Sequence, residues 1–181
     1  ASSGAMPDPT TDEAPRRSII QALGVLGTPR DPAFDRLVFI AAHLFRTPIA
    51  AVSVLDDNHV WYKARVGLAD PSLDRAVAFC GVAAGQLGPL LVEDASMDPR
   101  FHDSPLVTGP PGIRFYAGAP VLAPEGLCAR LGMAPMPVGV LCVMDRRRRL
   151  VTAGQMAYLL QLSREASELL AGMEAGWPAK R

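Results

Sequence analysis

The sequence lacks the residue groupings by which most enzymes and metalloproteins are identified. Its 181 residues include three cysteines, Cys80, Cys128 and Cys142, at wide spacing, with no CxxC and no Cys/His pair at metal-ligand spacing. It also lacks a glycine-rich phosphate loop and a nucleophile beside its base. We therefore expect no metal site and no enzymatic activity, and the sequence identifies no cofactor.

The chain has no excess of charge of either sign and no long hydrophobic run. Eighteen basic residues balance eighteen acidic ones, so no broad positive field attracts nucleic acid or an anionic membrane. The arginines at 146–149 are interpreted as a solvated turn. No apolar stretch approaches the roughly 20 residues needed to cross a bilayer. We expect a cytoplasmic protein with neither nucleic-acid nor membrane partners, in keeping with its sparse cysteines.

Composition predicts one domain with short tails. Nearly half of the residues, 49%, are hydrophobic, which is enough for a sizeable core. Residues 1–15 are rich in Ser, Pro, Thr and Asp and lack aromatic residues, so we expect them to be disordered. The predicted domain covers 16–173, and 174–181 form a C-terminal tail.

The first half of the domain predicts two helices followed by a hairpin. Apolar residues at helical spacing indicate a helix from Arg16 to about 26, and Asp31 before Pro32 is a good cap for a second helix. Residues 49–55 form a continuous apolar run typical of a buried strand. Residues 59–66 alternate, with 60, 62, 64 and 66 expected on one face and 61, 63 and 65 on the other.

The second half predicts a short helix at 79–84, a strand at 90–93, an ordered loop at 94–112, and strands at 114–122 and 138–145. Pro120 donates no ladder hydrogen bond, so a strand end or bulge is expected there. Thr152 and Gln155 have capping-box spacing and place the start of the last helix near Ala153. This order implies an α+β domain with an antiparallel sheet and its long helices on one face.

The last helix carries an apolar seam at 3, 4, 3, 4 spacing, formed by Leu159, Leu162, Ala166, Leu169 and Met173. The apolar face is broader than one sheet contact requires. The seam could therefore pack on the sheet, or it could support homodimerisation through the N- and C-terminal helices, and the sequence leaves both open.

Several segments, in this order, resemble the GAF domain, a sensory module of bacterial signalling proteins. They read LGVLGTPRDPAFDRLVFIAAHLF, TPIAAVSVLDDNHVWYKARVGL, AFCGVA, VEDASMDPRF, IRFYAGAP and VGVLCVMD. The resemblance implies a central antiparallel sheet, a ligand pocket closed by loops on one face, and helices on the other that often mediate dimers. It also implies a signalling output partner such as a histidine kinase or a diguanylate cyclase.

The chain departs from the ligand signatures of known GAF groups. None of its cysteines precedes a histidine, which argues against a covalent bilin, and the Asn-Lys…Phe…Asp-Glu pattern of cyclic-nucleotide binders is missing. The cysteine arrangement of the free methionine sulfoxide reductases, which share this fold, is missing too. The stretch 123–137 is longer and more apolar than the usual link before the last strand, so it either covers the pocket edge or meets a partner.

Eight residues are candidates for the pocket that strands 114–122 and 138–145 would line. They are Phe79, Cys80, Asp94, Arg100, Phe101, Arg114, Tyr116 and Cys142. An arginine and a tyrosine on a pocket wall can hold a carboxylate or a phosphate. The favoured alternative is that Arg100 or Arg114 pairs with Asp94 or Asp98 to fasten the loop.

The sequence thus predicts a regulatory domain that binds a small molecule reversibly and passes occupancy on through its terminal helices. Two alternatives stay open. One is a thiol-based redox sensor or enzyme in which Cys80 is resolved by Cys142 or Cys128, which requires Cα atoms no more than about 7 Å apart. The other is a dimerisation scaffold that binds no ligand.

Overall fold

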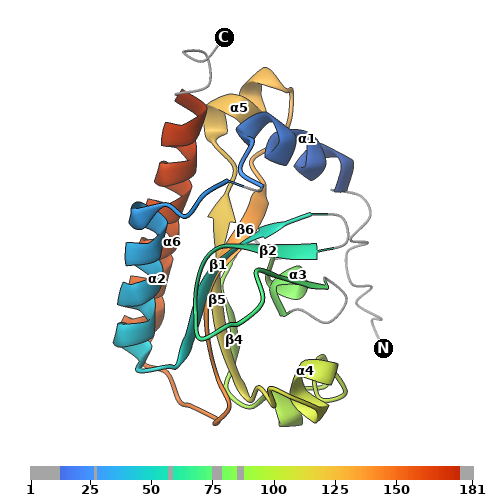
Figure 1. Ribbon diagram of the computed structural model, residues 1–181, viewed down its shortest axis with the longest axis vertical. Helices are drawn as coiled ribbons and strands as arrows, with labels where there is room; N and C mark the ends of the chain where they lie inside the picture. Colours follow the sequence, from blue (N-terminus) through green and yellow to red (C-terminus); the bar gives the residue numbers. More distant parts are fainter. Residues whose placement is uncertain (1–12, 27, 57–58, 75–78, 85–87, 176–181) are drawn as a thin grey trace.

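The computed structural model describes residues 13–26, 28–56, 59–74, 79–84 and 88–175 and contains one antiparallel sheet (Figure 1). Its six strands have the order β3-β2-β1-β6-β5-β4. Their bounds are β1 Ile49–Leu55, β2 His59–Val66, β3 Ser72–Asp74, β4 Leu90–Val92, β5 Phe115–Leu122 and β6 Pro137–Asp145. The central strands β1, β6 and β5 are buried along nearly their whole length, so both faces of the sheet are covered.

Helices cover the two faces unequally. The longer ones pack on one face with α5, and they are α1 Glu13–Leu23, α2 Pro32–Phe45, α5 Glu125–Arg130 and α6 Ala153–Ala175. The other face is covered by short pieces, namely α3 Phe79–Ala84, a 3₁₀ turn at Ala95–Met97 and α4 Pro105–Thr108. We call these the helix face and the α3 face. The predicted α+β architecture with long helices on one face is confirmed.

Both capped helices begin where the sequence predicts. The Asp31 carboxylate accepts a hydrogen bond from the Ala33 amide at 2.9 Å and caps α2. At α6 the Thr152 hydroxyl accepts from the Gln155 amide at 3.1 Å, while the Gln155 side chain accepts from the Thr152 amide at 3.0 Å. This reciprocal arrangement is a capping box, so local chemistry sets the start of each helix.

The hairpin β1–β2 has the predicted bounds, but the predicted alternation along β2 fails after Tyr62. Val52 pairs with Ala64 whereas Ser53 pairs with Tyr62, so Lys63 is the extra residue of a β-bulge. The bulge reverses the alternation, because Ala64 packs in the helix-face core while Val60 and Tyr62 contact the α3-face core. The placement of 60, 62, 64 and 66 on one face is therefore wrong.

The structure adds elements that the sequence did not predict. The stretch 123–137 contains α5, whose Leu127 and Cys128 enter the helix-face core, so this stretch covers the sheet end and not the α3 face. The loop 94–112 contains a 3₁₀ turn and α4, and β3 pairs with the start of β2. The strand β5 continues past Pro120, and its irregularity falls one residue later, between Val121 and Leu122.

Arg149, the last arginine of the 146–149 run, joins distant parts of the fold. Arg149 forms an ion pair with the buried Asp145 carboxylate, and its Nη2 donates to the Arg46 carbonyl at 2.8 Å. Its Nη1 donates to the Phe45 carbonyl at 3.3 Å. Arg149 thus joins the end of β6 to the last carbonyls of α2, and the solvated-turn interpretation fails for this residue. Within the described ranges, no helix has the length and apolarity needed to span a membrane.

Candidate functional site

Four of the predicted site residues meet in a packed cluster on the α3 face, which we call the aromatic cluster and define as Phe79, Phe101, Tyr116 and Cys142. The Phe79 ring stacks on Tyr116 with centroids 5.1 Å apart, and it lies 4.6 Å from Phe101. Tyr116 and Cys142 have no exposed surface, and Phe79 and Phe101 are 2% and 5% exposed. A ligand could enter here only if one of these side chains moved.

Tyr116 lies flat over the sheet because the residue two positions along has no side chain. A Cβ built on Gly118 would lie 2.6 Å from the Tyr116 hydroxyl and 2.9 Å from the Val140 side chain. Residues 116 and 118 project to the same face of β5, so only glycine leaves space for the tyrosine ring. Gly118 therefore allows the Tyr116 ring to occupy the position at which the sequence predicts a pocket.

The three charged candidates on this face fasten loops in the structure. The Asp94 carboxylate accepts from the Ser96 amide at 3.1 Å and caps the 3₁₀ turn. Arg114 donates to the Val107 carbonyl at 2.9 Å, which ties α4 to the start of β5. The structure does not gather these groups with the aromatic cluster into one polar site.

Arg100 pairs with Asp98, as the loop-fastening alternative predicts. Its Nη2 lies 2.8 Å from one carboxylate oxygen and its Nε 3.0 Å from the other. These hydrogen bonds lower the pKa of Asp98 below its ordinary value, and the Asp98 carboxylate raises the pKa of Arg100. The Arg100 guanidinium also lies 5.1 Å from the Phe101 ring centroid. The Arg100–Asp98 ion pair therefore stabilises the loop from which Phe101 enters the aromatic cluster.

The cysteines divide between the two faces. Cys142 lies in the α3-face core and Cys128 in the helix-face core, so the sheet separates them and the structure does not bring them together. The backbone of Cys80 lies in α3, which packs against β6 on the same face as Cys142. The Cys80 side chain lies outside the described part of the chain, so its predicted role stays a prediction.

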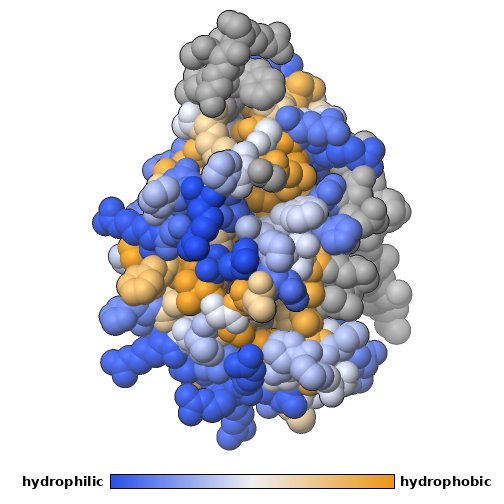
Figure 2. Space-filling view, viewed as in Figure 1, coloured by the Kyte–Doolittle hydropathy of each residue, from blue (hydrophilic) through white to orange (hydrophobic). Residues whose placement is uncertain are grey.

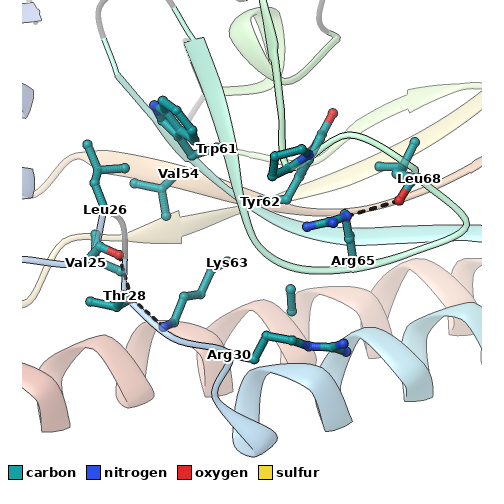
Figure 3. A pocket seen from close by; sticks show the side chains of 12 residues that line it. Val25, Leu26, Thr28, Arg30, Val54, Trp61, Tyr62, Lys63, Arg65 and Leu68 are labelled. Atoms are coloured by element: carbon teal, nitrogen blue, oxygen red, sulfur yellow. Dashed lines mark hydrogen bonds between the residues drawn. The ribbon is translucent and has the colours of Figure 1, made fainter.

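A hollow among the described residues lies elsewhere, alongside β2. A cavity of about 490 Å³ opens between β2 and the connector from α1 to α2, residues 24–31 (Figure 3). Its apolar wall is formed by Val25, Leu26, Val54, Trp61 and Leu68, and its basic side chains are Arg30, Lys63 and Arg65. We call it the β2 cavity. Figure 2 shows hydrophobic and hydrophilic surfaces side by side on the side of the molecule that is turned toward the viewer in Figure 1.

Lys63 is the bulged residue that links the wall of the β2 cavity to the connector. Its ammonium donates to the Thr28 hydroxyl at 2.6 Å and to the Pro29 carbonyl at 2.8 Å, and it lies 5.9 Å from the Phe34 ring centroid. Burial lowers the pKa of Lys63, while Asp31 and Asp35 act in the opposite direction. Sequence reasoning missed this cavity because alternation alone assigns Lys63 to an exposed strand face.

Comparisons with known proteins agree with this architecture. The GAF domain family model matches residues 29–170, which is well over half of the chain. The chain belongs to the GAF domain family. A curated relative, a cyclic di-GMP phosphodiesterase of Pseudomonas aeruginosa, is 40% identical over 145 residues, which cover 80% of this chain. The match covers only 23% of that relative's length.

Solved structures share the GAF fold at low sequence identity. The GAF domain of an Acinetobacter phosphoenolpyruvate-protein phosphotransferase aligns with a TM-score of 0.59 at 19% identity, covering 97% of this chain and 98% of that one. The free methionine-R-sulfoxide reductase of Neisseria meningitidis, solved with its substrate, also gives 0.59, at 15% identity and 91% and 92% coverage. At these identities the likeness establishes the fold alone.

The same comparisons correct one prediction. The expectation that the chain has no enzymatic activity is wrong, because the curated relative is named as a phosphodiesterase and the structures similar to this GAF domain include methionine sulfoxide reductases. Known enzymes share this fold, so the absence of common catalytic motifs from the sequence does not exclude catalysis.

Proposed function

We propose that this GAF domain senses a small molecule on the α3 face and relays its presence to α2 and α6 on the helix face, as the regulatory part of a signalling protein. The main support is the alternation along β5 and β6. Tyr116 and Cys142 belong to the aromatic cluster, while the adjacent Ala117 and Val143 pack in the helix-face core. Adjacent residues of one strand point to opposite faces of the sheet. A shift of the aromatic cluster therefore moves β5 and β6, and with them the side chains against which α2 and α6 pack.

A hydrogen bond supplies the direct link from the sheet to the last helix. The Leu122 amide at the end of β5 donates to the Ser167 hydroxyl of α6 at 2.9 Å. The same hydroxyl donates to the Ser163 carbonyl within α6 at 3.0 Å. A ligand that prefers a displaced Phe79 would shift the population toward a second arrangement of β5, and Ser167 would carry that shift into α6.

The test compares hydrogen exchange in α6 between proteins with a filled and an emptied aromatic cluster. Native mass spectrometry first identifies any small molecule retained on purification, and exchange is measured with and without it. Phe79→Ala empties the cluster without a ligand, and we expect faster exchange in both β5 and α6. Adding Ser167→Ala should keep the change in β5 and abolish it in α6.

Ser163→Ala provides the matched control, because the Ser163 hydroxyl donates within α6, to the Leu160 carbonyl at 2.8 Å, and makes no hydrogen bond to β5 among the described residues. It should leave the transmission from Phe79→Ala intact. Unchanged exchange in α6 on both ligand removal and Phe79→Ala would refute the relay.

We further propose that the output is a signalling reaction such as cyclic di-GMP hydrolysis, carried out by another part of a longer protein or by a partner. The support is the 40% identity to a phosphodiesterase that is much longer than this chain. A chimaera tests this, with residues 29–170 replacing the matching part of the Pseudomonas relative. Its hydrolysis of cyclic di-GMP should change with Phe79→Ala and recover with the added Ser167→Ala. Equal rates in all three proteins would contradict the proposal.

The homodimer through the terminal helices stays a prediction. In α6, Leu159, Leu162 and Ala166 are buried against the domain itself, whereas Leu169 and Met173 are half-buried at its edge. A second copy of the chain would therefore contact Leu169 and Met173 at the edge of the seam. Sedimentation velocity over a range of protein concentrations distinguishes a monomer from a homodimer.

A further inference from the structure

We propose that the β2 cavity is a second ligand site, separate from the aromatic cluster, and that it takes a small organic anion with an apolar body, such as an arylalkyl carboxylate or an aryl phosphate. The site lies along β2, and no residue of the aromatic cluster lines it, so the inference does not depend on the proposed sensing function.

The charge of the lining residues determines the sign of the ligand. Twelve of the described residues line the cavity, and these twelve include Arg30, Lys63 and Arg65 but no aspartate or glutamate. Two acidic residues lie close by without lining the cavity. Asp31 caps α2, and Asp35 accepts from Arg30 Nε at 3.3 Å. An anion entering the cavity would therefore meet cationic groups on the strand and on the connector without a carboxylate facing it.

Among the three cations, Arg65 is the best placed to hold an anion. Its Nε donates to the Leu68 carbonyl at 3.0 Å, which fixes the plane of the guanidinium. Its two terminal nitrogens make no hydrogen bond to any other described residue. A half-buried guanidinium with two adjacent donors matches a carboxylate or a phosphate in bidentate geometry. Lys63 adds charge, although two of its protons are already committed to Thr28 and Pro29.

The remaining wall selects an apolar body of limited size. The Trp61 indole, Val54 and the Leu26 side chain lie close together in Figure 3 and form the apolar end of the cavity. A volume of about 490 Å³ lies within the usual range of roughly 300–1,000 Å³ for small-molecule sites. A phenyl group fits this space and can stack on the indole, while an acidic group on a short linker reaches toward the basic side chains.

A ligand bound in the β2 cavity would restrict the movement of α1. The cavity is bounded on one side by the connector that joins α1 to α2 and on the other by the bulged strand. An anion held by Arg65 and Lys63 would bridge the two, so we expect it to restrain the connector and the end of α1.

The experiment uses Trp61 as a reporter inside the site. The chain has two tryptophans, Trp61 and Trp177, so Trp177→Phe leaves emission from the cavity alone. Phenylacetate and phenyl phosphate are titrated against this protein, with 2-phenylacetamide as the uncharged analogue. We expect a saturable change in emission with both anions and at least tenfold weaker binding of the amide.

Substitutions place the anion beside Arg65. Arg65→Gln should weaken phenylacetate about tenfold and leave the amide unchanged, because only the charged contact is lost. Arg164→Gln, at an exposed position on α6, is the matched control and should change neither. Arg30→Gln removes a rim cation whose side chain is 79% exposed and should weaken the anion two- to threefold, which keeps the test usable if Arg65→Gln fails to fold.

Three results would overturn the proposal. The first is the absence of any saturable change in Trp61 emission with either anion. The second is equal affinity for phenylacetate and its amide, which would remove the preference for charge. The third is unchanged phenylacetate affinity in both Arg65→Gln and Arg30→Gln, which would place the anion at another site.

Discussion

Replacing Gly139 with alanine tests whether the centre of the sheet is as close-packed as the structure indicates. Gly139 lies in β6 opposite Val54 of β1. A Cβ built there would lie 1.9 Å from the Ser53 carbonyl oxygen and 3.0 Å from the Ser53 carbonyl carbon. Ordinary contact for such an atom begins near 3.4 Å, so the two strands would have to separate by at least about 1 Å.

The expected cost follows from what that separation breaks. The obstacle is backbone on a strand paired on both sides, so no side-chain rotation relieves it. Losing two or three ladder hydrogen bonds of roughly 1 kcal/mol each, with added strain, costs about 3–5 kcal/mol. A domain of this size has a free energy of unfolding of roughly 5–15 kcal/mol, so much of its stability would be lost. The melting temperature should fall by roughly 10 °C.

Urea unfolding followed by circular dichroism measures this loss, and Gly172→Ala supplies a control with the opposite sign. Gly172 lies in α6, and a Cβ built there has no heavy atom within 4 Å outside its own helix backbone and chain neighbours. Alanine in a helix is favoured over glycine by roughly 0.5–1 kcal/mol, so this variant should be slightly more stable than the wild type. A Gly139→Ala protein whose stability lies within about 1 kcal/mol of the wild type would refute the packing described.

Two further predictions concern the ion pairs. Because Arg100 lowers the pKa of Asp98, the pair stabilises the fold above the ordinary aspartate pKa and loses that contribution as pH falls through the lowered value. Asp98→Asn should therefore cost about 1 kcal/mol at neutral pH, with a gap to wild type that closes on acidification; a gap independent of pH in urea titrations would contradict this. Arg149→Met should cost roughly 2–4 kcal/mol, because it leaves the buried Asp145 carboxylate without its ion-pair partner. Asp145→Asn in the same chain should recover part of the loss, and no recovery in thermal unfolding would exclude a buried uncompensated charge as the cause.

Local sequence signals predicted the regular elements well, since their causes lie within a few residues. The bounds of β1, β2 and α3 agree with the sequence pattern, and α6 begins one residue after its capping threonine. The elements it missed are short. In α5, the N-cap is Pro124 and no side chain caps the helix, so only the burial of Leu127 and Cys128 identifies it.

The proximity of four candidate residues agrees with the sequence analysis, and their role in binding a ligand stays a prediction. Phe79, Phe101, Tyr116 and Cys142 were chosen as residues of one site, and the structure does bring them together. Their mutual packing depends on the pairing of β5 with β6 and on the ring of Tyr116 covering Gly118, neither of which a single strand reveals. Asp94, Arg100 and Arg114 were chosen because their side chains can bind charged ligands. In the structure they form hydrogen bonds within and between the loops.

The sequence by itself determined where the long helices and the central strands form, because capping, periodicity and turn chemistry act over neighbouring residues. The tertiary structure alone decided the bulge at Lys63, the cavity beside β2 and the division of the cysteines between the two faces. Each of these depends on how segments distant in the chain pair and pack, and a one-residue change of register moves a side chain from one face of the sheet to the other.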